Sequence, residues 1–342
     1  MSRTQPASWR APARSVPERL GSFWSRVGLI LWALALSPVA AAESPTNYYS
    51  SVDSSTGSAL RASLHALVDD HQRYPYTSTA TDTWDILEEA QSDPDAEGFI
   101  LDLYGDRSLP RQGGGNSEYN REHTWPKSYG FPNDSSQNSA YTDCHMLFLA
   151  DSGYNSSRSN KPYGVCDASC TEKPTGEAFD ESPLPDVYPG QSNWTKAGVW
   201  ETWEGRRGDV ARALLYADIR YEGGSHGGTG GPEPDLILTD EIDLIETTPG
   251  NASMAYMGNR STLLEWHRHD PPDEEERARN DIIQSYQGNR NPFIDHPEWA
   301  DCIFSEICGA GPVPLPTLNP VFLTVGILAI ALTGFTIERR IA

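Results

Sequence analysis

The sequences at the two ends of the chain are the strongest constraint on which residues can belong to the folded domain. Residues 1–42 begin with a basic segment that holds five Arg, continue with an apolar run over 27–36 and end in three Ala before Glu43. This order of basic, apolar and small residues is typical of a secretory signal peptide. The basic segment is long for a signal peptide, so an uncleaved membrane anchor is the alternative. In both cases we expect the body of the protein to leave the cytoplasm.

The C-terminal end predicts a second segment that prefers a membrane. Residues 311–316 are rich in Pro and predict a stiff, extended linker. The mostly apolar run over 321–337 then ends in Glu-Arg-Arg, and its length is at the short limit for a spanning helix. The arginines that follow it would remain on the cytoplasmic side.

The Leu-Pro-Thr-Leu stretch at 315–318, the apolar run and the terminal arginines resemble the IPTL/PEP-CTERM type of sorting tail found in Gram-negative bacteria. That resemblance implies transient attachment to the inner membrane and processing by a sorting machinery. The final location would be the periplasm, the cell surface or the medium. An ordinary C-terminal membrane anchor is the alternative.

Five cysteines in an exported chain predict disulfide bonds. Four of them stand in close pairs, Cys166 with Cys170 and Cys302 with Cys308, while Cys144 is alone in an apolar stretch. The simplest interpretation is two local disulfides and one buried thiol, although five cysteines allow other pairings. A zinc site is less favoured, because the pairs lack the usual C-x₂-C spacing and histidine partners.

Between the two ends, apolar periodicity predicts an α+β domain with more helix than strand. Helices are expected over residues 58–71, 81–91, 209–221, 262–266 and 273–286, and a strand over 99–104. Thr81 or Asp82 would cap the second helix, and 223–234 reads as a flexible break. No linker interrupts the body, so we expect a signal peptide over 1–42, one domain over 43–312 and a linker with a membrane helix over 313–342.

Three polar segments within about 40 residues interrupt the apolar pattern. They read Tyr-Asn-Arg-Glu-His-Thr-Trp-Pro-Lys-Ser over 119–128, Thr-Asp-Cys-His-Met-Leu-Phe-Leu-Ala-Asp over 142–151 and Asn-Ser-Ser-Arg-Ser-Asn-Lys over 155–161. Phosphodiester hydrolysis needs a base with a pKa near neutrality and a hard divalent cation held by oxygen ligands. His123, Glu122 and Asn155 supply that set.

Adjacent strand residues point to opposite faces. Glu122 and His123 can therefore share one site only at a strand end or a bulge. Structural interpretations also exist for each residue: a buried hydrogen-bonded histidine at 123, a surface carboxylate at 122 and a helix cap at 155.

Together these segments resemble the endonuclease I family of secreted bacterial nucleases, part of the ββα-metal (His-Me finger) superfamily. Further similar stretches are Arg-Gly-Asp-Val-Ala-Arg over 207–212, Arg-Asn-Asp over 279–281 and the run over 287–297. Separate motifs in the right order across roughly 60–300 make the resemblance specific. It implies an α+β fold in which a ββα-metal nuclease core is surrounded by additional helices.

The resemblance also implies roles for individual residues. His123 matches the general base, and Glu122 and Asn155 match the ligands of Mg²⁺ or another hard divalent cation such as Ca²⁺ or Mn²⁺. His145 matches a histidine that supports the site without touching the metal. The family pattern Asp-Leu-His followed by His or Asn reads Asp-Cys-His-Met here, over 143–146.

Some relatives place an Arg between the first two motifs to stabilise the transition state. This chain has only Lys127 there, so Arg158 is the best remaining candidate for a catalytic cation. The remaining candidates for supporting the site or contacting substrate are Arg121, Lys127, His145, Lys161, Gln287, Asn289 and Arg290.

Charge argues against nucleic-acid binding at first sight. The chain has a net charge of −22, and removing the +4 of residues 1–42 and the +1 of residues 320–342 leaves −27 for the part between. Such a body repels polyanions at long range. The motif segments are nevertheless basic, with Arg121, Lys127, Arg158, Lys161, Arg206, Arg207, Arg212 and Arg290. We therefore expect a basic cleft on an acidic body, with weak and salt-sensitive binding of phosphates.

These observations predict a secreted, monomeric, metal-dependent endonuclease that hydrolyses DNA, and also RNA, to 5′-phosphate products with little regard for sequence. The alternative is a catalytically silent, surface-held nucleic-acid-binding protein on the same fold. A secreted protease is disfavoured, because the chain lacks a zinc-binding His-x₃-His helix, and a secreted glycosidase is the other class we set aside.

Overall fold

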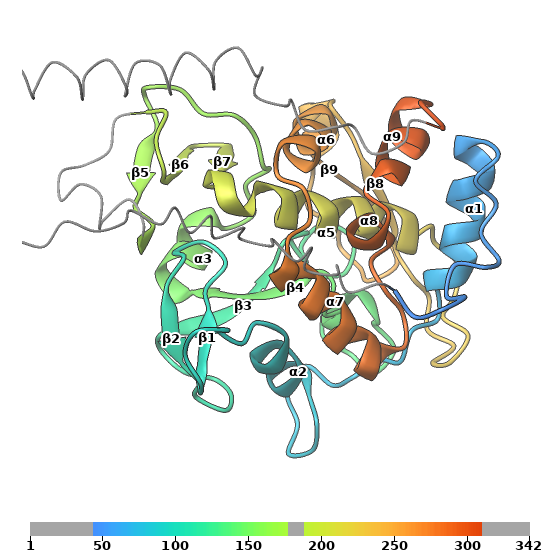
Figure 1. The fold of residues 1–342 in the computed structure, drawn as a ribbon, viewed down its shortest axis with the longest axis horizontal. Helices are drawn as coiled ribbons and strands as arrows, with labels where there is room; N and C mark the ends of the chain where they lie inside the picture. Colours follow the sequence, from blue (N-terminus) through green and yellow to red (C-terminus); the bar gives the residue numbers. More distant parts are fainter. Residues whose placement is uncertain (1–43, 177–187, 310–342) are drawn as a thin grey trace, which may run out of the picture. The chain divides into compact units, whose positions relative to one another are not determined.

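A computed structural model of the chain describes residues 44–176 and 188–309 (Figure 1). These residues form the α+β fold that the periodicity predicts. The helices are α1 (Gly57–Val68), α2 (Thr83–Ala90), α3 (Ser152–Arg158), α5 (Arg207–Arg220), α6 (Arg260–His269), α7 (Glu274–Gln287), α8 (Pro292–Asp295) and α9 (Glu298–Ser305), with short 3₁₀ turns η1 (Ala140–Thr142), η2 (Glu204–Arg206) and η3 (Ile242–Leu244).

The strands are short and pair within small sheets. They are β1 (Phe99–Leu101), β2 (Ser108–Pro110), β3 (Tyr119–His123), β4 (Leu147–Asp151), β5 (Thr171–Lys173), β6 (Asn193–Lys196), β7 (Val199–Glu201), β8 (Asp235–Leu238) and β9 (Met254–Met257). The pairs β1–β2 and β3–β4 and the three-stranded sheet β5–β6–β7 are antiparallel, whereas β8 and β9 are parallel.

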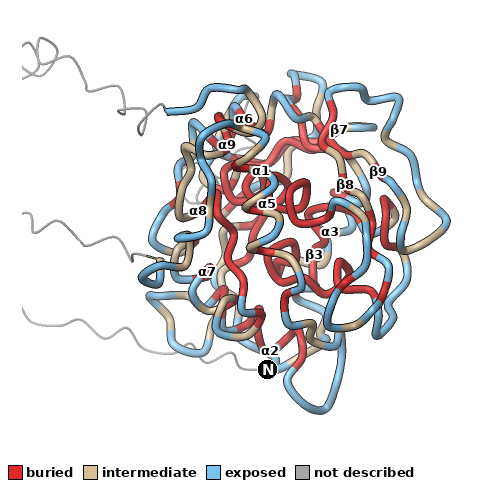
Figure 2. The backbone as a smooth tube through the Cα atoms, turned by 90° about the vertical axis from the view of Figure 1, so that its right-hand side faces the viewer, coloured by how far each residue is buried: buried red, intermediate tan, exposed pale blue. Residues whose placement is uncertain are grey.

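Helix α5 forms the centre of the core. Every residue from Gly208 to Arg220 is buried, and Figure 2 shows the helix as a red coil inside the fold. A helix that is covered on all sides needs neighbours around its whole circumference, and α1, α6, α8 and β8 supply them. The helix predicted over 209–221 is therefore confirmed, and it begins at Arg207.

The segment that carries the three motifs folds as two strands followed at once by a helix. β3 and β4 are antiparallel, with Tyr119 opposite Asp151 and His123 opposite Leu147. Asp151 then caps α3, because its carboxylate accepts the backbone N–H groups of Gly153 and Tyr154 at 2.8 and 2.9 Å. This unit brings the end of the first motif beside the third.

Several predicted boundaries change in the structure. Asp82 is the cap of α2 and forms a capping box with Asp85. The strand expected over 99–104 ends at Leu101, because Asp102 turns the chain by accepting the N–H of Gly105 at 2.8 Å. The helix expected over 262–266 is longer and spans Arg260–His269. The predicted break over 223–234 is a hydrogen-bonded loop, closed by His226 N–H to Gly231 O at 2.9 Å.

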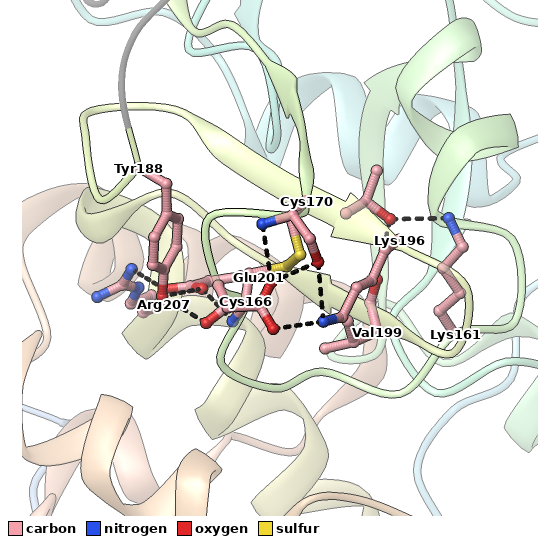
Figure 3. Close-up of a disulfide and its surroundings, with 11 residues drawn as sticks. Lys161, Cys166, Cys170, Tyr188, Lys196, Val199, Glu201 and Arg207 are labelled. Atoms are coloured by element: carbon pink, nitrogen blue, oxygen red, sulfur yellow. Dashed lines mark hydrogen bonds and ion pairs between the residues drawn. A yellow bond between two sulfur atoms is a disulfide. The ribbon is translucent and has the colours of Figure 1, made fainter.

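The cysteine interpretation is confirmed. Cys166 is bonded to Cys170 and Cys302 to Cys308, and Cys144 is a buried free thiol. The first disulfide loop is fixed to β7, because the N–H of Cys166 donates to the Glu201 carboxylate, which also binds Arg207 at 2.6 Å (Figure 3). Glu201 thus connects the disulfide loop to the start of α5.

The signal peptide predicted over 1–42 and the tail predicted over 313–342 lie outside the described residues. Among the helices of residues 44–176 and 188–309, none has the length and apolar character needed to cross a bilayer.

Candidate active site

The orientation of His123 is set by a backbone carbonyl. His123 is the last residue of β3 and is 8% exposed. Its Nε2 lies 3.0 Å from the carbonyl oxygen of Tyr141. Because a carbonyl can only accept, Nε2 carries the hydrogen and Nδ1 keeps its lone pair. No described residue bonds to Nδ1. Burial lowers the pKa of His123 to about 3, so the ring is neutral with one nitrogen free to take a proton.

Aromatic rings hold the plane of this imidazole. Tyr76 stacks on it with the ring centroids 5.8 Å apart, and Tyr141 meets it edge-on at 5.0 Å. Phe131 lies against it at 6.1 Å. From the sequence we did not expect any of these three residues at the site. Tyr141 directly precedes the second motif, which is a signal that could have marked it, but Tyr76 stands in a loop with no such signal.

Glu122, the residue before His123, is held by a different set of contacts. It is 2% exposed, and its Oε1 accepts hydrogen bonds from the hydroxyl of Tyr104 at 2.9 Å and from Arg158 at 2.7 Å. Tyr104 in turn shares a 2.7 Å hydrogen bond with Tyr163. Burial raises the pKa of the Glu122 carboxyl, and the charge of Arg158 opposes that rise. Within the described part of the chain, nothing donates to the second oxygen, Oε2.

Helix α3 packs on β3 and brings Asn155 to the backbone of Arg121, the residue before Glu122. Its Nδ2 donates to the backbone oxygen of Arg121 at 3.3 Å. This bond orients the amide and leaves Oδ1 without a donor among the described residues. A carboxylate oxygen and an amide oxygen are therefore free on adjacent elements.

Carboxylate and amide oxygens are of the ligand type that a hard divalent cation prefers. Mg²⁺ prefers oxygen ligands, keeps several waters and commonly takes one or two protein groups. In the described ranges no cluster of three or more His, Cys, Asp or Glu side chains could hold a metal, so a site with few protein ligands and several waters is the arrangement that these residues allow.

Arg158 is buried next to Glu122 and does not reach solvent. It is fully buried, and besides Glu122 it donates to the backbone oxygens of His123 at 2.7 Å and Thr124 at 2.6 Å. Its guanidinium also lies 4.5 Å from the ring centre of Tyr163. These contacts tie the last turn of α3 to the end of β3.

The other basic candidates differ in their access to solvent. Lys127 is exposed, and its Nζ lies 2.7 Å from the hydroxyl of Tyr141. Because Tyr141 packs against His123, this contact places a solvent-exposed cation close to His123. Lys161 is half-buried and donates to Ser157 O and the Thr195 hydroxyl. Arg121 is buried, with its guanidinium 3.3 Å from the ring centre of Tyr76.

His145, Gln287 and Asn289 meet in a buried polar network around Asp143. Gln287 donates to Asp143 at 3.0 Å, and His145 Nε2 lies 3.2 Å from the backbone oxygen of Asn289. The other Asp143 oxygen accepts the hydroxyls of Tyr216 and Tyr221, each at 2.9 Å. This Asp143 network supports the turn that follows Tyr141.

Arg290 has a different environment from the rest of the candidates. Its guanidinium is buried and binds Asp281 at 2.6 Å, Asp295 at 2.6 and 2.8 Å and Gln284 at 2.7 Å. It therefore holds the end of α7 against α8. The structure does not bring it to His123.

Comparison with known proteins adds independent information. A sequence model of the endonuclease I family matches residues 56–298. The chain is 36% identical over 309 residues to an extracellular ribonuclease of Bacillus subtilis (strain 168), covering 87% of this chain and 94% of that protein. It is 37% identical over 260 residues to an extracellular ribonuclease of Bacillus amyloliquefaciens, covering 75% of this chain and 78% of that protein.

Proposed function

This chain belongs to the endonuclease I family, and from that premise we propose that it is a secreted, metal-dependent nuclease that cuts both DNA and RNA with little sequence preference. Hydrolysis of phosphodiester bonds follows from the family and from the two related ribonucleases. Secretion is supported by the extracellular naming of those relatives and by the two disulfides, which are typical of oxidising compartments.

The geometry of His123 supports this function best. A general base must be unprotonated and must present its lone pair to a water molecule. The hydrogen bond from Nε2 to Tyr141 O makes Nδ1 that acceptor. We assign His123 Nδ1 the proton of the attacking water, while the Tyr141 carbonyl stabilises the imidazolium that forms.

Glu122 and Asn155 are the proposed metal ligands, through the two oxygens that lack protein donors. A bound Mg²⁺ or similar hard cation would neutralise charge on the phosphate and on the departing oxygen. On this assignment the unit β3–β4–α3 is the ββα-metal core, with the rest of the described helices packed around it.

The positions of the basic residues suggest different roles for them. Arg158 holds the Glu122 carboxylate in place through their buried ion pair. Lys127 is the cation that reaches solvent next to His123, so it is the better candidate for contact with a substrate phosphate. Because these groups recognise the backbone and no described element suits the reading of base edges, DNA and RNA should both be substrates.

Plasmid DNA and ribosomal RNA, each incubated with the purified protein and Mg²⁺, test the proposal. Both should be degraded, and end-labelling should show 5′-phosphate and 3′-hydroxyl ends. Fragments with 3′-phosphate ends would contradict attack by water. An intact substrate bound without cleavage would instead favour the catalytically silent binding protein.

Metal dependence is tested by EDTA and by two variants. EDTA should stop cleavage, and Glu122→Gln or Asn155→Ala should raise the Mg²⁺ concentration that half-maximal rate requires. Asn160→Ala, an exposed asparagine just after α3, is the matched control and should leave that concentration unchanged. Full activity in EDTA, with no metal detected in the protein, would rule out the metal.

A further inference from the structure

A cavity outside the nuclease site lies between α2, α7 and the first turn of α5. Its volume is about 550 Å³, within the range of roughly 300–1,000 Å³ typical of small-molecule sites. None of the residues proposed above for catalysis or metal binding lines it.

The inner wall of the cavity is apolar. Leu101, Leu103 and Phe148 form it from the strand side, and Ile282 closes it from α7. The guanidinium of Arg279 covers the Phe148 ring at 3.8 Å from the ring centre. A ligand with an apolar body would gain free energy by covering this wall.

One end of the cavity carries a buried carboxylate with a free oxygen. Asp209, in the first turn of α5, is 5% exposed and lines the cavity. Its Oδ2 pairs with Arg206 at 3.2 Å, but Oδ1 has no hydrogen-bond partner within residues 44–176 and 188–309. Oδ1 is not fully enclosed, so a ligand in the cavity can reach it and donate a hydrogen bond to it.

The charge of the residues that line the cavity determines which charge a hydrogen-bond-donating ligand should carry. The carboxylates of Glu89, Asp209, Glu274, Glu275 and Glu276 face the guanidinium groups of Arg206 and Arg279. Both arginines are already bonded, Arg206 to Glu275 at 2.6 Å and Arg279 to the backbone oxygen of Cys144 at 2.7 Å. Glu276 is likewise paired, with the buried Arg212 at 2.8 Å. The other four carboxylates of the lining still outnumber its two arginines, and this negative excess disfavours an anion.

The other ligand classes fit less well. A neutral apolar molecule would bury Asp209 Oδ1 without a donor. A bare metal ion would meet an apolar wall, and the described residues hold no metal-binding cluster. An organic cation with N–H donors and an apolar body fits both the Asp209 carboxylate and the apolar wall of the cavity.

We infer that this cavity binds a small organic cation, whose amine, amidine or guanidine group donates to Asp209 and whose apolar part covers Leu103 and Phe148. This site is independent of the proposed nuclease function, because it shares no residue with it. Its test uses binding alone.

Benzamidinium, a phenyl ring with an amidinium group, is a suitable probe, and benzoate is its anionic counterpart. Isothermal titration calorimetry on the full chain should show saturable 1:1 binding of benzamidinium and no binding of benzoate. Absence of benzamidinium binding, or equal affinity for benzoate, would contradict the inference.

Three variants locate the site. Asp209→Asn should weaken benzamidinium binding at least about tenfold, or about 1.4 kcal/mol. Since Asp209 also pairs with Arg206, a second variant, Ile282→Trp, fills the cavity without changing a charge and should abolish binding in a folded protein. Glu241→Gln, an exposed carboxylate outside the lining, should bind as the wild type does. Full affinity in Ile282→Trp would place the probe elsewhere and overturn the assignment.

Discussion

At position 123 the backbone, rather than another side chain, decides which ring nitrogen can accept a proton. The carbonyl of Tyr141 fixes the hydrogen on Nε2, and three aromatic rings fix the plane of the imidazole. As the proposed base, His123 is therefore oriented before any substrate arrives, which would lower the cost of reaching the transition state.

Replacement of this imidazole should separate catalysis from folding. We expect His123→Ala to reduce the cleavage rate by about 10²–10⁴-fold, the usual contribution of a general base, while circular dichroism shows a folded protein. His269→Ala is the matched control, because His269 is an exposed histidine on α6 and should leave the rate unchanged. If His123→Ala kept about half of the wild-type rate at neutral pH, another group would be the base.

At the scale of elements, one buried ion pair joins α3 to β3. Arg158 is enclosed by Glu122 and by the backbone oxygens at the strand end. Removing one partner of a buried pair leaves the other charge unpaired, at a cost of about 3–5 kcal/mol. The position of Arg158 thus matters for the packing of the nuclease site as well as for its charge.

We expect Arg158→Met to lower the free energy of unfolding by about 3–5 kcal/mol in a urea titration. The control is Arg268→Met, which removes a surface ion pair to Asp301 and should cost less than about 1 kcal/mol. A loss of activity in Arg158→Met without loss of stability would mean that Arg158 acts on the substrate, as the sequence analysis proposed.

The junction of α6 and α5 carries a carboxyl group that responds to pH. Asp270 follows α6 and accepts the N–H of Gly208 at 2.7 Å. Burial raises its pKa from 3.8 to about 6, Asp209 and Asp273 add to the rise, and the Gly208 hydrogen bond and Arg212 oppose it. The folded protein therefore binds this proton more tightly than the unfolded chain does.

Between about pH 4 and pH 6 the free energy of unfolding should fall as pH rises. In that window the folded state holds the Asp270 proton and the unfolded chain does not, so removal of protons from solution favours the unfolded chain. The full effect of the shift is of the order of 3 kcal/mol. Asp270→Asn should flatten the dependence of the free energy of unfolding on pH in that window. Identical pH profiles for wild type and variant, measured by urea unfolding, would show that Asp270 does not have the raised pKa.

For the whole molecule, the net negative charge opposes a polyanionic substrate. The chain carries −22, while the cation beside His123 is the exposed Lys127. Binding of a polyanion then depends on a small number of phosphate contacts against a repulsive background.

Cleavage of long DNA should therefore fall roughly tenfold or more between 50 and 200 mM salt, as expected when phosphate contacts release counterions. The sequence of the DNA should matter little. A phosphodiester with a single charge, such as bis-p-nitrophenyl phosphate, is the control, and its hydrolysis should change little over the same range. A rate on long DNA that ignores salt would contradict binding through phosphates.

Local patterns alone determined much of this fold. Apolar spacing identified α1, α2, α5 and α7, because apolar residues at helical period are visible in each of these segments. The close cysteine pairs predicted both disulfides, since short loops favour local bonds. The motif resemblance also selected the family that the comparisons support.

Only the tertiary structure decided how the candidate site is built. Tyr76 reaches His123 from a loop without periodicity, and Tyr141 contributes a backbone oxygen that no side-chain pattern records. The pairing of Arg158 with Glu122 and the position of Arg290 in the α7–α8 contact depend on which elements pack together. The contacts of His123 and Arg158 join separate segments of the chain, and those of Arg290 depend on how α7 and α8 pack, so their free energy has no signature in the local apolar pattern.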